Sequence, residues 1–179
     1  MSRSPLADAF THHIWATLRI LDACAALSAE QLATIVPSTA RSILDTARHL
    51  VGGDAWYLFY LTEDRAFVAD AESIARTWDP TAMDLAALRA ATARHAAGWS
   101  KLLSLDLDPD RMVKEVDEDD GYQRDAPVGI RLAQAVHHGT DHRSQISTAL
   151  TLLGLEPPAI DVWDYGIDSG RATEILPSP

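Results

Sequence analysis

The sequence has a single cysteine, Cys24, so no disulfide can form within the chain. It also has no apolar run close to the ~20 residues that a membrane-spanning helix needs. Polar residues follow the segment Met1–Leu6 directly, unlike the apolar core of a secretory signal peptide. These absences predict a protein of the reducing cytoplasm that does not enter a membrane.

Basic residues are scarce as well. Lys and Arg number 15 against 26 Asp and Glu, so the formal net charge is −11. Nucleic-acid binding relies on a basic face that neutralises phosphates, and this charge argues against it. The 179 residues are 47% hydrophobic and 23% charged, which is typical of one globular domain and excludes a disordered acidic chain. We therefore expect a single domain over residues 1–179.

Several motifs that would point to a known chemistry are missing. There is no glycine-rich phosphate loop of either common type. Gly139 follows His138, which excludes the H-E-x-x-H helix of zinc proteases. No Glu lies three residues before a His, so the di-iron bundle motif is also excluded. The acidic run Asp117–Asp120 lacks the spacing of a calcium loop and is interpreted as a solvent-exposed loop.

Apolar residues that recur at spacings of three and four predict four long helices. The third helix is expected to begin near Asp79-Pro80, and Ser28 with Gln31 predicts a capped helical turn after the first. Four helices of this length predict an all-α four-helix bundle. The four predicted ranges are about 6–27, 40–62, 79–104 and 127–153.

The segments between and after these helices carry weaker signals. Val113 and Val116 flank charged residues before the turn signal Asp120-Gly121, which predicts a small β-hairpin ahead of the last helix. The tail from residue 159 to 179 is interpreted as an ordered loop packed on the bundle. Inside the second helix, Gly52-Gly53 indicates a close helix contact or a site that needs room.

Two of the seven histidines form the most informative pattern. His138 and His142 are four residues apart on the last predicted helix, so they share one face. A helical wheel places both on the flank of the apolar stripe, turned partly inward. The rival pair, His137 and Asp141, turns toward solvent on the same wheel. We therefore take His138 and His142 as the candidate metal ligands.

A third histidine can complete this site. His49 lies on the flank of the apolar stripe of the second predicted helix, in line with Trp56 and Tyr60. Three neutral imidazoles with an open position for water are the catalytic pattern of zinc, and imidazole also suits nickel, iron and copper. The alternative, histidines that only pack inside the bundle, stays open.

At this point the residues resemble a known family. The segments His49–Tyr57 and Val136–Gln145 are similar to the DinB family, within the wider group of DinB/YfiT-like metalloenzymes. The segments Phe10–Ala16 and Pro157–Trp163 are similar to its bacterial members. The resemblance covers nearly the whole chain, and its most specific part is H-x-x-x-H-R-x-Q with a lone upstream His.

The resemblance implies an up-down-down-up bundle with a long crossover, often paired as a homodimer. It also places the metal triad on His49, His138 and His142. Many relatives have H-R-G-Q, whereas this chain has Ser144 in place of the glycine. Because serine is small, we expect the helix packing to survive this exchange.

The same resemblance implies a metal-dependent enzyme, since relatives include thiol-using transferases and isomerases and suspected hydrolases. We expect a divalent metal, zinc first and nickel, iron or manganese as alternatives, that activates water or a low-molecular-weight thiol toward a small electrophilic substrate. Asp45, Asp141 and Gln145 are expected beside the triad, with a catalytic role for Asp141. The alternative is a metal-binding or stress-response protein without catalysis. The residues expected to line the pocket are Phe10, Trp56, Tyr60 and Trp99.

Overall fold

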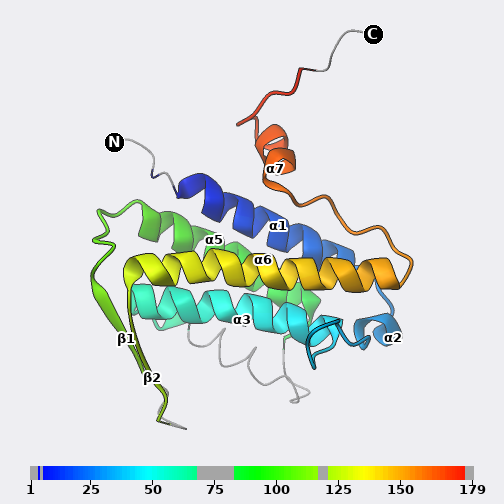
Figure 1. Ribbon diagram of the computed structural model, residues 1–179, viewed down its shortest axis with the longest axis horizontal. Coiled ribbons are helices and arrows are strands. Elements are labelled where there is room, and N and C mark those ends of the chain that lie inside the picture. Colours follow the sequence, from blue (N-terminus) through cyan, green and yellow to red (C-terminus); the bar gives the residue numbers. More distant parts are fainter. Residues whose placement is uncertain (1–3, 5, 68–82, 117–120, 176–179) are drawn as a thin grey trace.

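The computed structural model describes residues 4, 6–67, 83–116 and 121–175. Helices α1 and α6 run in one direction, and α3 and α5 run in the other (Figure 1). The all-α bundle and its up-down-down-up order are therefore confirmed. The four long helices are α1 (Ala7–Ala25), α3 (Ile43–Thr62), α5 (Leu85–Leu103) and α6 (Val128–Leu152).

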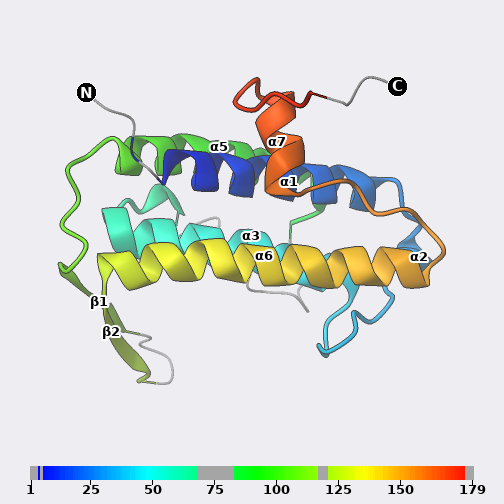
Figure 2. The same ribbon diagram turned by 45° about the horizontal axis from the view of Figure 1, so that its top comes forward.

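The four helices form two layers. Helix α1 lies beside α5 in one layer, and α3 lies beside α6 in the other (Figure 2). Across the layers, α1 also packs on α6 and α3 packs on α5, whereas α1 and α3 are diagonal and make little contact. In the described ranges, no helix is both long and apolar enough to cross a membrane.

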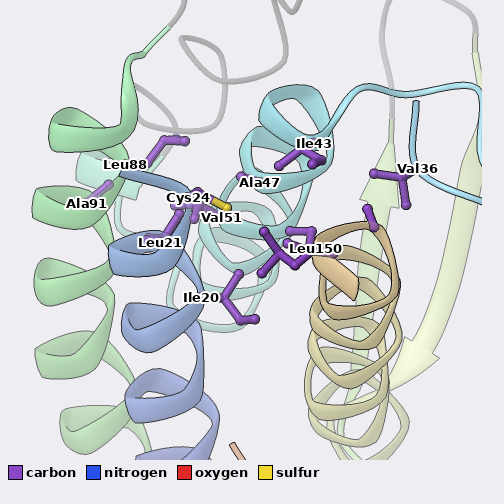
Figure 3. Close-up of a cluster of buried hydrophobic side chains, with 12 residues drawn as sticks. Ile20, Leu21, Cys24, Val36, Ile43, Ala47, Val51, Leu88, Ala91 and Leu150 are labelled. Atoms are coloured by element: carbon purple, nitrogen blue, oxygen red, sulfur yellow. The ribbon is translucent and has the colours of Figure 1, made fainter. Parts of the chain in front are cut away.

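The apolar stripes of all four helices meet in the core. One cluster of fully buried side chains includes Ile20, Val51 and Ile146 (Figure 3). It extends to Val36 in the segment between α1 and α3. Cys24 lies in the same cluster, where burial raises the pKa of its thiol to about 12. The cysteine is therefore a small hydrophobic core residue and is not a reactive thiol.

Side-chain caps explain where the helices begin. Ser28 and Gln31 form a complete capping box at the start of the short helix α2 (Ala29–Leu32), as predicted. The α5 helix begins at Leu85, because the Asp84 side chain accepts a hydrogen bond from the backbone of Ala87. The predicted start near Asp79-Pro80 was too early, and those two residues lie outside the described ranges.

The β-hairpin before the last helix is confirmed. Strands β1 (Met112–Val116) and β2 (Gln123–Pro127) pair antiparallel, and Gly121 has a positive φ of 74° in the connection. The acidic run 117–120 in that connection lies outside the described residues. Arg131 of α6 anchors the hairpin, because its guanidinium donates to the Glu115 carboxylate at 2.9 Å and to the carbonyls of Val113 and Arg124 at 3.1 Å.

The tail corrects one prediction. It packs on the bundle as expected, but it is not only a loop, because α7 (Val162–Asp168) forms behind an Asp161 cap. The Tyr165 hydroxyl lies 2.6 Å from Thr11 Oγ1, and Trp15 Nε1 donates to Asp168 at 2.8 Å. These contacts hold α7 across α1. A helix of seven residues is too short for its periodicity to stand out in the sequence.

We predict that Arg131→Met lowers the free energy of unfolding by about 2 kcal/mol, because it removes three hydrogen bonds from a guanidinium that is 4% exposed. Urea denaturation measures this change. The control Arg89→Met removes an exposed ion pair with Asp22 and should leave stability unchanged within error. Equal losses in both variants would contradict this account of the hairpin anchor.

Candidate metal centre

Helices α3 and α6 bring together the three histidines that the sequence predicted. His49 lies on α3, and His138 and His142 lie on α6. The ring centroids are 4.5 to 5.0 Å apart in every pair. One nitrogen of each ring lies within 4.8 Å of the other two, so the three side chains converge on one point.

The separation of one nitrogen pair matches that of two ligands on a tetrahedral metal ion. His138 Nε2 lies 3.3 Å from His49 Nε2. Two imidazole nitrogens that each bind zinc at about 2.05 Å in tetrahedral geometry are separated by about 3.3 Å. His142 Nδ1 lies 2.7 Å from Gln145 Oε1, an acceptor, so the ring proton is on Nδ1 and Nε2 carries a lone pair. The predicted position of Gln145 beside the triad is thus confirmed.

Electrostatics keeps two of these histidines neutral. Burial, helped by the nearby Arg41 and His142, lowers the pKa of His49 to about 4. Burial and the two neighbouring histidines lower the pKa of His138 to about 3. Both imidazoles are therefore unprotonated at neutral pH, which is the form that binds a metal ion.

A glycine makes room for His138. A Cβ atom on Gly53 would overlap the His138 ring, so the imidazole packs directly on the backbone of α3. The predicted need for room at Gly52-Gly53 is confirmed at Gly53. Gly139 does the same on the neighbouring face of α6, where a Cβ atom would overlap the ring of His13 on α1.

A buried polar network next to the triad was not predicted. His13 Nε2 lies 2.8 and 3.0 Å from the two Asp54 carboxylate oxygens, and Arg143 Nη1 lies 3.0 Å from His13 Nδ1. Burial lowers the pKa of Arg143 to about 10, so it stays a cation at neutral pH. Burial alone would raise the pKa of Asp54, but its interaction with His13, which includes the hydrogen bond from Nε2, outweighs burial and lowers this pKa. The sequence held only a weak signal for this network, namely the charged residue Asp54 on an apolar helix face.

Aromatic side chains of α3 lie on the hairpin side of the triad. The Tyr57 ring lies edge-on to His138 with centroids 5.6 Å apart, and its hydroxyl accepts a hydrogen bond from Gln134 at 3.4 Å. Burial raises the pKa of Tyr57, so its hydroxyl keeps its proton. Trp56 and Tyr60 stack on each other with centroids 5.9 Å apart.

Two residues expected in the same pocket lie elsewhere. Phe10 and Trp99 contact each other with centroids 4.5 Å apart and line a cavity of about 1060 Å³ between α1 and α5. Helices α1 and α5 form the layer opposite to α3 and α6 (Figure 2). The expectation that these rings share a pocket with the triad was therefore wrong, because the helix register could not be derived from the sequence.

The remaining expected residues have these positions. The Asp45 carboxylate accepts hydrogen bonds from Ser42 and Arg48, which places it in the cap of α3. Asp141 is exposed, and its catalytic role stays a prediction. Ser144 is also exposed, and α6 continues through it, so the exchange at this position is compatible with the helix packing.

Comparison with known proteins agrees with this site. The model of the DinB family matches residues 1–169. The chain belongs to the DinB family. No curated protein and no solved structure matches it. Family membership and the three-histidine cluster together fit a metal-binding protein.

We predict that Gly53→Ala weakens metal affinity at least about tenfold although all three histidines remain, because the new methyl group displaces the His138 ring. Titration with Co²⁺ and competition with Zn²⁺ measure the affinity. The matched control is Gly129→Ala on α6, where the new Cβ would make ordinary contacts of 3.4 and 3.6 Å with Pro109. Wild-type affinity in Gly53→Ala would refute this role of the glycine.

Acidification should destabilise the metal-free DinB protein. In the unfolded chain His49 and His138 have the ordinary histidine pKa of ~6.5, whereas in the folded protein burial lowers the pKa of His49 to about 4 and that of His138 to about 3. Between these values the unfolded chain binds more protons, so stability is full above the window and is lost as pH falls. Urea denaturation across the window should show a steeper loss for wild type than for His49→Gln/His138→Gln. Parallel curves would contradict the neutral state of these residues.

Proposed function

We propose that this DinB protein is a metal-dependent enzyme in which His49, His138 and His142 bind one divalent transition metal ion. The observation that carries this proposal is the convergence of three imidazoles whose nitrogens lie within 4.8 Å of one another, with those of His49 and His138 3.3 Å apart. Zinc is the first candidate, because three neutral imidazoles are its common catalytic ligand set. Nickel, iron and manganese are the alternatives.

Three protein ligands leave a coordination position for another molecule. An ion in such a site lowers the pKa of bound water toward ~7, or holds a low-molecular-weight thiol as its thiolate. Either nucleophile would attack a small electrophilic substrate, which makes the protein a hydrolase or a thiol-dependent transferase. The hydrogen-bond and ring contacts of the triad among the described residues are with one another, Gln145 and Tyr57, none of which is a serine or cysteine, and this supports a nucleophile supplied at the metal.

The residues around the triad have separate tasks in this proposal. The Gln145 side-chain oxygen accepts a hydrogen bond from His142 Nδ1–H and so holds that ring with Nε2 toward the ion. The Tyr57 hydroxyl accepts from Gln134, so its own proton is available for an oxygen of the substrate. Asp141, exposed on the turn that carries His138 and His142, is the candidate for proton transfer at the rim.

The proposal also covers the substrate class, the oligomeric state and the cellular location of the protein. A net charge of −11 supports a small-molecule substrate over a nucleic acid. The family resemblance supports a homodimer, and the buried lone Cys24 is consistent with a protein of the cytoplasm.

A metal-binding protein without catalysis is the second candidate. One observation favours it: two cavities formed by the described residues, of about 1060 and 740 Å³, are lined by residues other than the triad. A sensing or storage protein needs no substrate pocket beside its metal ion. The two candidates differ in whether the ion accepts a further ligand.

We predict that the untagged protein contains about one transition metal ion per chain, and that His142→Ala loses it, because two imidazoles alone bind too weakly. Elemental analysis of the purified proteins measures the occupancy. The control His137→Ala removes an exposed histidine of the same helix and should keep the metal. Full occupancy in His142→Ala would refute the triad.

The Co²⁺-substituted protein then separates the two candidate functions. Addition of a low-molecular-weight thiol should shift the absorption bands of the ion if a coordination position is open, as an enzyme requires. An unchanged spectrum at saturating thiol, together with no hydrolysis of activated esters or amides, would favour the protein without catalysis.

A further inference from the structure

A chain of three buried polar residues lies on the face of α6 that is turned toward α1. Asp54, His13 and Arg143 are 1%, 0% and 2% exposed and come from α3, α1 and α6. None of the three belongs to the candidate ligand set. Their joint burial inside a helical bundle needs a reason, because buried charges are unfavourable unless they are fully hydrogen-bonded.

Arg143 determines the direction of the hydrogen bonds among these three residues. The Arg143 guanidinium can only donate, so His13 Nδ1, 3.0 Å away, must accept. The single ring proton of His13 is therefore on Nε2, and it is donated to the Asp54 carboxylate. The neutral ring thus connects an anion to a cation, and the three residues together carry no net charge.

These three hydrogen-bonded residues connect α1, α3 and α6 at one level of the bundle. Arg143 also donates to the Thr17 hydroxyl and the His13 carbonyl of α1, at 3.2 and 3.4 Å, and to Thr140 of its own helix at 3.3 Å. The His13 ring packs on Gly139, where no side chain separates it from the α6 backbone. These contacts determine both the rotation of α6 and its distance from α1.

Three anchor points of this network, on α3 and α6, are adjacent to a candidate ligand or to its support. Gly139 follows His138, and Arg143 follows His142, so each anchor is one residue, or about 100° of rotation, from a ligand. Asp54 follows Gly53, on which the His138 ring packs. A rotation of α6 that broke the bonds to His13 would also turn His138 and His142 away from His49.

We infer that Asp54, His13 and Arg143 are positioning residues that set the rotation of α6 and thereby hold His138 and His142 in the geometry that binds the metal ion. This inference rests on the proposed metal site and adds the device that orients it. Well-packed apolar residues stabilise a core at least as well as a buried ion pair does. Directional hydrogen bonds add a defined orientation, which a metal site needs.

Two variants test the inference. Asp54→Asn removes the anion and leaves the Arg143 cation without its counter-charge. Asp54→Asn/Arg143→Met removes both charges, so the core regains neutrality and most of its stability, but not the bonds that orient α6. We expect both variants to bind Co²⁺ at least about tenfold more weakly than wild type and to show shifted absorption bands of the bound ion.

Leu102→Ala is the matched control, because Leu102 is 3% exposed in α5 and belongs to the hydrophobic cluster around Phe10 and Trp99, so its loss destabilises the core without removing any of the hydrogen bonds of Asp54, His13 and Arg143. It should keep wild-type affinity and the wild-type spectrum. Circular dichroism confirms that each variant is folded, and the double variant carries the test if Asp54→Asn does not fold.

The outcomes separate the two proposals. A wild-type protein that binds no Co²⁺ refutes the metal site itself. Wild-type affinity in Asp54→Asn and in the double variant overturns the positioning role alone. Affinity that falls in Asp54→Asn and returns in the double variant also overturns it, because charge balance and not orientation would then be the cause. Loss in both variants with an intact Leu102→Ala supports the inference.

Discussion

The close approach of α3 and α6 at Gly53 is the contact on which the candidate metal centre depends. The His138 ring occupies the space where a side chain would otherwise stand, and this brings its Nε2 within 3.3 Å of His49. A wider helix spacing would leave the same histidines in place along the chain but too far apart to share an ion. The arrangement uses a residue that weakens a helix, since glycine lowers helix propensity by about 1 kcal/mol relative to alanine.

Polar burial takes two forms in this bundle, and they lie on neighbouring faces of α6. Toward α3, burial keeps His49 and His138 neutral, with pKa values of about 4 and about 3. Toward α1, Asp54 and Arg143 remain charged because His13 connects them. The face toward α3 supplies nitrogen lone pairs for a metal ion, and the face toward α1 supplies directional hydrogen bonds within the protein. Two glycines, one at each face, allow a histidine ring to approach the backbone.

Much of the architecture was predictable because its signals are local. The capping box at Ser28 and the glycine and prolines after α6 mark helix ends within a few residues of sequence. The hairpin was predictable from its valines and from the turn at Gly121. Helix α7 was missed because seven residues give no clear period, and its stability comes from contacts such as that of Tyr165 with Thr11, 154 residues away.

The sequence by itself determined that His138 and His142 share a face, because a spacing of four is a property of any α-helix. It also singled out this pair, since no other two histidines of the sequence lie four residues apart. Only the tertiary structure decided that His49 joins them across 89 residues and that His13 meets Asp54 and Arg143 across 41 and 130. Such pairings depend on helix rotation and register, which arise when four apolar stripes pack together.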